Sequence, residues 1–97
     1  MTAGGREVSS ASLHAADGDP LAQAGTRDTV LASVHAIAER TGVELLKVDI
    51  FDQRIDVQVY GSEILVLGLL AELRRNTDHW HRQRLGTPLW ISPSGDD

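Results

Sequence analysis

The sequence predicts one small domain of the α+β class, in which an antiparallel sheet carries helices on one face. Three patterns support this: helical spacing of apolar residues over 26–41, strict alternation over 43–61, and a second helical pattern from residue 62. A chain of 97 residues has room for a single domain. We expect that domain over residues 26–93, in the order helix, β-hairpin, helix and one or two further strands.

Both ends of the chain lack such patterns. Residues 1–25 are rich in Gly, Ala, Ser and Asp, and so little apolar surface cannot offset the entropy lost on ordering the backbone. We therefore expect a disordered N-terminal tail over residues 1–25 and a disordered C-terminus over 94–97. No segment near the start resembles a signal-peptide core, and the longest apolar run, residues 64–71, is too short for a bilayer, which needs about 20 residues. These features predict a soluble, cytoplasmic protein without membrane contact, and the preference for arginine over lysine is typical of a GC-rich bacterial genome.

The first helix is predicted by apolar residues spaced three and four apart. Thr26 or Asp28 can cap its start, and Gly42 stands where a helix usually ends. The face expected to pack on the sheet consists of Val30, Leu31, Val34, Ile37 and Ala38.

The hairpin follows, because the apolar period changes to two. A tight turn at Asp52 and Gln53 completes one apolar face and thereby sets the register. The same register places Asp49 across from Asp56, where we expect both carboxylates to be solvated. The predicted apolar pairs are Ile50 with Ile55, Val48 with Val57, and Leu46 with Val59.

A second helix begins after Ser62, and its apolar residues wrap most of its circumference. The sheet and the first helix cannot easily cover all of that surface in so small a domain. The simplest remaining cover is a second copy of the chain, arranged as a two-fold homodimer. The expected interface residues are Leu65, Leu67, Gly68, Leu69 and Leu70.

Two interpretations of residues 77–92 are open. In the first, the helix breaks at 76–78, because Asn, Thr and Asp are poor in a helix interior, and residues 79–85 form a strand. In the second, the helix continues and Gly86 caps it. The break is favoured, with a strand near residues 88–92 in either case.

The stretch from Arg74 to Arg84 carries four arginines and one acid, in a chain whose formal net charge is −5. Its basic and aromatic side chains are the candidate binding group, either as the rim of a packed interface or as a grip on phosphate with Trp80 stacked on a base. A weaker hypothesis is a metal site at His79 and His81, which share one face if the stretch is a strand. The candidate binding residues are Arg74, Arg75, His79, Trp80, His81, Arg82 and Arg84.

Enzymatic chemistry has the least support. The chain has no cysteine, no HExxH helix, no glycine-rich phosphate loop and no nucleophile elbow. We therefore expect no catalytic residues, no cofactor and no bound metal. The predicted function is a non-catalytic, small dimerising binding or adaptor module, with a protein as one candidate partner. The alternative is a nucleic-acid-binding regulator that uses the cluster from Arg74 to Arg84.

Overall fold

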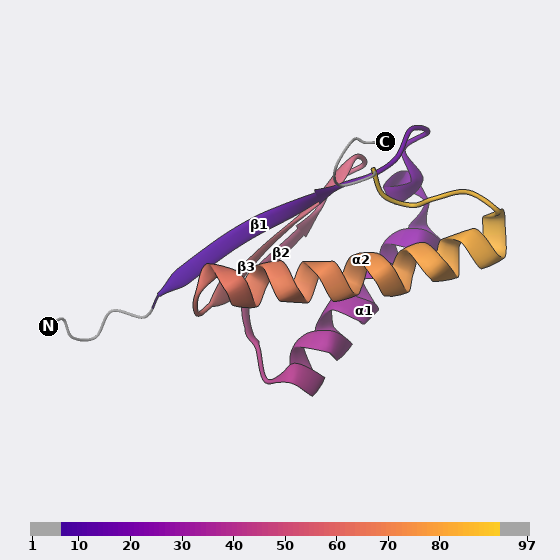
Figure 1. Ribbon diagram of the computed structural model, residues 1–97. Helices are drawn as coiled ribbons and strands as arrows, with labels where there is room; N and C mark the ends of the chain where they lie inside the picture. The colour runs from indigo at the N-terminus through magenta and orange to yellow at the C-terminus, as the bar shows by residue number, and fades with distance from the viewer. Residues whose placement is uncertain (1–6, 92–97) are drawn as a thin grey trace, which may run out of the picture.

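The computed structural model describes residues 7–91, so the predicted disorder at residues 94–97 lies outside the described residues. Two helices pack on one face of a three-stranded antiparallel sheet, which confirms the α+β class and the helix–hairpin–helix order (Figure 1). The elements are β1 (Val8–His14), a short 3-10 helix (Pro20–Ala22), α1 (Ala24–Thr41), β2 (Glu44–Ile50), β3 (Arg54–Tyr60) and α2 (Glu63–Leu85).

Strand β1 corrects the expectation of a disordered tail for the residues from Val8 onward. It forms an edge of the sheet, in the order β1-β3-β2, and pairs with β3 along its whole length. Its inward residues Ser9, Ala11 and Leu13 lie opposite the valines and isoleucine of β3. The alternation is hard to detect in the sequence because the inward positions begin with a serine and an alanine, and because the partner strand is distant. Ser12 Oγ donates a hydrogen bond to Asp56 Oδ1, at 2.6 Å, across 44 residues.

The hairpin register is confirmed at its turn and in its middle. Ile50 pairs with Ile55, Val48 with Val57, and Asp49 with Asp56. The last predicted pair is wrong, because an irregularity between Leu45 and Lys47 leaves Leu46 out of the ladder. Leu45 takes its place opposite Val59, and the side chain of Leu46 is 42% exposed. A bulge of this kind shifts the side chains beyond it to the other face.

Helix α1 ends at Gly42 as predicted, with a positive φ of 77°, but it begins earlier than expected. Its N-cap is Gln23, so neither Thr26 nor Asp28 caps it, and Thr26 is buried within the first turn. The predicted face is otherwise confirmed except for Leu31, which is 38% exposed.

Helix α2 runs without a break through residues 76–78 and ends at Gly86, which has a positive φ of 76°. The favoured break and the strand over 79–85 are therefore wrong, and the alternative of a continuous helix is correct. Residues 86–91, called the return segment below, fold back beside the helix. The expected strand near 88–92 is reduced to one bridge between Trp90 and Ala15.

The core lies between the helices and the inner face of β3. Among residues 7–91, no helix has the length and apolar character needed to cross a membrane. The side chains with no exposed surface include Leu21, Val30, Val34, Ile55, Val57, Val59, Val66, Leu73 and Leu89.

Candidate functional site

The second half of α2 is polar because it holds the return segment. Thr77, which is 1% exposed, donates a hydrogen bond from Oγ1 to the carbonyl of Leu73 at 2.6 Å. The same oxygen accepts a hydrogen bond from the indole Nε1 of Trp90 at 2.9 Å. The threonine hydroxyl thus satisfies the one polar group of a tryptophan that is otherwise buried. Threonine is a poor helix former, but Thr77 stands inside the helix and accepts a hydrogen bond from Trp90, thirteen residues later.

Asp78 is the second anchor of the return segment. Its Oδ1 accepts a hydrogen bond from the backbone N–H of Leu89 at 2.8 Å, and its Oδ2 accepts one from Arg82 Nε at 2.7 Å. Burial by itself raises the pKa of this carboxyl, but the bonds from Arg82 and Leu89 outweigh it and hold the pKa below the ordinary value of 3.8. The carboxylate is therefore charged and bonded on both oxygens at neutral pH.

His81 is the third anchor and is 3% exposed. Its Nδ1 lies 2.7 Å from the carbonyl oxygen of Thr87, which can only accept, so Nδ1 carries a proton and donates it. The second ring nitrogen, Nε2, is then a hydrogen-bond acceptor in the neutral imidazole. His79 is exposed, and a helix turns residues two apart to different sides. The structure therefore does not bring His79 and His81 together, and residues 7–91 contain no group of three or more metal-ligating side chains.

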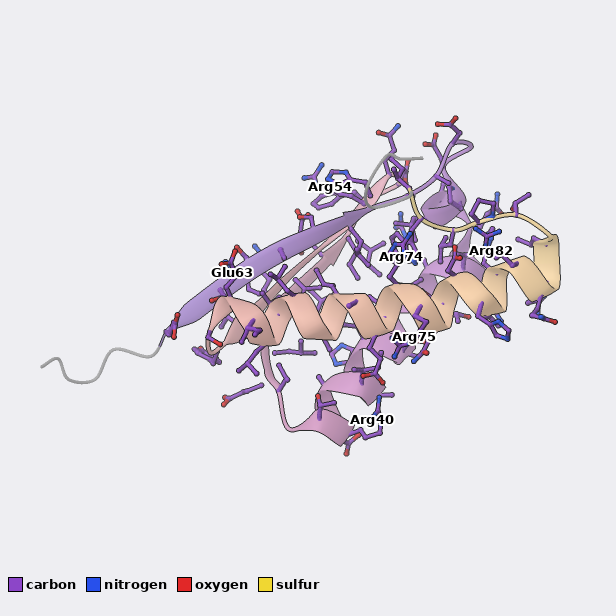
Figure 2. All side chains as sticks on the ribbon, in the orientation of Figure 1. Arg40, Arg54, Glu63, Arg74, Arg75 and Arg82 are labelled. Atoms are coloured by element: carbon purple, nitrogen blue, oxygen red, sulfur yellow. The ribbon has the colours of Figure 1, made fainter. Side chains whose placement is uncertain are left out.

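The clustered arginines take separate directions along α2. Arg82 pairs with Asp78, Arg74 Nη2 lies 3.5 Å from the carbonyl oxygen of Ile91, and Arg84 lies over the ring of Trp80, 5.7 Å from its centroid. Figure 2 shows Arg74 and Arg75 leaving the helix on different sides. These four side chains do not form one continuous basic surface. This arrangement weakens the hypothesis that the cluster binds the phosphates of a nucleic acid.

A groove of about 970 Å³ lies beside the end of α2. Trp80, His81 and Arg84 form one wall, so the structure brings together three of the seven candidate binding residues. The facing wall comes from residues 16–20 and from the first turns of α1, including Thr26. Sequence reasoning missed this second wall, because residues 1–25 were expected to have no structure.

The predicted dimer interface is partly wrong. Leu69 and Leu70 are each 3% exposed and belong to the core of their own chain. Leu65 is 43% exposed and lies against the turn at Gly61, where an added Cβ would stand 2.5 Å from Leu65 Cδ1. Leu67 is 50% exposed and stays available.

Part of the exposed apolar surface of α2 is a stripe formed by Ile64, Leu67, Gly68 and Ala71, which we call the α2 stripe. These residues follow the spacing of one helical face, and Ile64 is the most exposed large apolar residue in the described part of the chain, at 75%. Ile64 was not among the predicted interface residues, although its spacing from Leu67 and Gly68 was available in the sequence.

The α2 stripe lies on the solvent side of α2, and this helix runs beside β1 (Figure 1). Arg74, one helical turn after Ala71, reaches the carbonyl of Ile91, and the N–H of Ile91 donates to the carbonyl of His14 at 2.9 Å. The N–H of Ala16 in turn donates to the carbonyl of Leu89 at 2.8 Å. The return segment therefore covers the end of the β1 edge. Within residues 7–91, no strand pairs with that edge over residues 8–13.

The outer face of the sheet is polar. Asp56 accepts hydrogen bonds from Ser12 and from Arg54 Nε, at 3.0 Å for the arginine, and Lys47 Nζ lies 3.4 Å from Asp49. Burial raises the pKa of Asp56, but the bonds from Ser12 and Arg54 hold it below 3.8. The two facing carboxylates are thus compensated by neighbouring side chains.

No protein-family model matches the chain, and no curated protein matches it in sequence.

Proposed function

We propose that this protein is a non-catalytic binding module that acts as a homodimer, with the α2 stripe and the outer edge of β1 as its self-association surface. The observation that carries the proposal is that α2, which exposes this stripe, runs beside β1, whose outer edge is unpaired over residues 8–13 of the described chain (Figure 1).

The α2 stripe favours a partner because its side chains are left in water. Ile64 and Leu67 are 75% and 50% exposed. Full burial of one such side chain contributes about 1.5–3 kcal/mol to the free energy of association. A two-fold dimer contains each of these residues in both copies, so the contribution is made once per copy. Gly68 adds to this, because an added Cβ would meet nothing within 4 Å in its own chain. Its backbone is therefore open to close approach by another helix.

The β1 edge favours the same partner. Exposed edge strands are usually protected by lysine, proline, a bulge or a covering loop. Residues 8–13 read Val-Ser-Ser-Ala-Ser-Leu and contain no charge and no proline. The return segment covers only the end of the strand near Ala15. The remaining backbone groups are available to another strand.

A second copy of the chain fits both features at once. Antiparallel pairing of β1 with β1 around a two-fold axis perpendicular to the sheet would join the two sheets into one of six strands. Both α2 helices would then lie on the same face and run antiparallel, with Gly68 and Ala71 near the axis. Glu63 at one end of the stripe would face Arg75 of the other copy, so the charges are complementary.

Sedimentation equilibrium at micromolar concentration tests the proposal. We expect a species of about twice the 10.5 kDa chain mass. Gly68→Glu should give a folded monomer, because the new side chain projects into open space in one chain but into the interface of the dimer. Ala36→Glu, at an exposed position of α1, is the matched control and should remain dimeric. A wild-type protein that stays monomeric at high micromolar concentration would overturn the proposal.

A further inference from the structure

We infer that the groove between residues 16–29 and the end of α2 binds a small molecule in which a flat aromatic ring carries an anionic group, either a carboxylate or a phosphate. This inference rests on the proposed binding function, since it assigns the ligand site of that module. It does not depend on the dimer, because the α2 stripe and the groove have no residue in common.

The groove is left open by its own chain. Its volume of about 970 Å³ is at the upper end of the range usual for small-molecule pockets. Gly25 lies in its wall, and an added Cβ there would meet no atom within 4 Å. A position in the first turn of a helix therefore faces free space and not a packed neighbour.

Two side chains in the wall each have a polar atom without a partner in the described part of the chain. Thr26 is 5% exposed, and its hydroxyl has no hydrogen-bond partner within residues 7–91. His81 is 3% exposed and uses only Nδ1, so Nε2 is unpaired within the same part of the chain. Neither atom is sealed from solvent, since the described residues contain no fully enclosed side-chain nitrogen or oxygen without a partner. Both groups line the groove, so they are available to what occupies it.

An anionic group is favoured by the start of α1. The first intrahelical bond runs from the N–H of Arg27 to the carbonyl of Gln23. In the described chain, the N–H groups of residues 24–26 have no backbone partner, and the helix has neither a side-chain cap nor an acidic residue in its first turn. Its partial positive charge is thus uncompensated. The Arg84 side chain supplies a full positive charge on the facing wall.

One acidic residue lines the described part of the groove. Asp17 is exposed, so water screens its charge, whereas Thr26 in the same wall is 5% exposed. The balance of donors in the wall therefore favours an anion.

A flat ring is favoured by Trp80. Its indole is half-buried, with the Arg84 guanidinium 5.7 Å from the ring centroid and the His81 ring edge-on at 6.1 Å. An aromatic ligand can lie against these planar groups while its anionic end reaches α1. His81 Nε2 can accept a hydrogen bond from the ligand, or donate one when the ring is protonated.

The probes are 2-naphthoate, 2-naphthyl phosphate and 2-naphthamide, which share one ring and differ only in the head group. Each is titrated to millimolar concentration into ¹⁵N-labelled full-length protein. We expect the two anions to shift the backbone signals of Gly25 and Thr26 and the indole signal of Trp80. The indole signal of Trp90, which is bonded to Thr77, should not move. The anion with the lower dissociation constant identifies the carboxylate or the phosphate as the preferred head group.

Variants assign the site. Gly25→Leu should abolish the shifts, because Gly25 lines the groove and a Cβ added there meets no protein atom within 4 Å. Arg84→Gln should weaken anion binding about tenfold through loss of a charge-assisted bond. Gly68→Glu should bind as well as the wild type, so loss of the dimer and loss of the ligand site are distinguishable. Equal affinity for 2-naphthamide, shifts that map outside the groove, or no shifts with either anion would overturn the inference.

Discussion

The two halves of α2 use opposite chemistry on one continuous helix. Residues 63–73 are almost entirely apolar, and although one side packs on the core, Ile64 and Leu67 stay in water. Residues 74–85 are almost entirely polar, yet Thr77 and His81 are buried there and hydrogen-bonded to the return segment. The polar half thus bonds to the return segment of its own chain, whereas Ile64 and Leu67 of the apolar half have no cover among the described residues.

This difference supports the position proposed for the partner. A polar residue in a helix can be a structural bond whose other member lies elsewhere in the chain, as with Thr77 and Trp90. An apolar helix residue with a high exposed fraction has no such partner within its own chain. The basic and aromatic stretch that attracts attention in the sequence is therefore largely structural. The aliphatic half carries the proposed association surface, and of the basic and aromatic stretch Trp80, His81 and Arg84 line the groove.

The largest expected effect concerns the two tryptophans, which are ten residues apart but in different environments. Trp90→Ala should cost about 3–5 kcal/mol of unfolding free energy, because Trp90 is 3% exposed and anchors the return segment. Trp80→Ala should cost about 1 kcal/mol, since its ring is only half-buried against the open groove. Urea denaturation of both variants measures the difference. Equal losses would show that the second half of α2 is not organised around the return segment.

Asp78→Ala should cost about 1–3 kcal/mol, because it leaves the N–H of Leu89 without its acceptor. The loss should depend on pH. The folded pKa of Asp78 lies below its unfolded value, so its stabilisation is present above about pH 4 and disappears as pH falls through the folded pKa. Chemical denaturation from pH 7 to pH 2.5 should therefore show the wild-type and variant curves converging at the acid end. Asp56, whose pKa is also lowered, remains in both proteins and contributes equally. A gap of constant size would indicate that the charge of Asp78 is not what stabilises the return segment.

Gly68→Ala tests whether the apolar half of α2 forms a dimer interface. In an isolated chain this change should stabilise by about 1 kcal/mol, because glycine is a poor helix former and the added methyl meets nothing. In a dimer with Gly68 near the axis, the same methyl should obstruct helix contact and raise the dissociation constant. Sedimentation and thermal unfolding across a range of protein concentrations separate the two effects. Stabilisation that is the same at every concentration would place Gly68 outside the interface.

Most of the fold could be predicted from the sequence because its signals are local. Both helices, the hairpin and its turn at residues 52–53 follow from periods of 3.6 and two within short windows. Strand β1 could not be predicted in this way. Its serines and alanine give little contrast between faces, and its pairing with β3 depends on residues more than forty positions away.

The candidate site was predicted in part for the same reason. Trp80, His81 and Arg84 stand out by residue type, and the structure brings them into one wall of the groove. The facing wall was not predicted, because residues 16–25, which form most of it, had been assigned no structure. Leu69 and Leu70 were misassigned because composition shows how much of a helix is apolar but does not show which side the sheet covers.

The smallest expected effect separates two neighbours that carry the same helix-breaking signal. Asn76 is exposed and has no hydrogen-bond partner among the described residues, so Asn76→Ala should stabilise by about 0.5 kcal/mol through helix propensity alone. Thr77→Ala should instead destabilise, because it leaves the Trp90 indole N–H buried without an acceptor. Thermal unfolding of the pair, side by side with the wild type, gives the two signs directly. If both changes stabilised, Thr77 would be an ordinary poor helix former, and the hydrogen bond to Trp90 would not explain why the helix continues through it. Opposite signs would show that a tertiary bond, formed thirteen residues later, decides the local structure at this point of the chain.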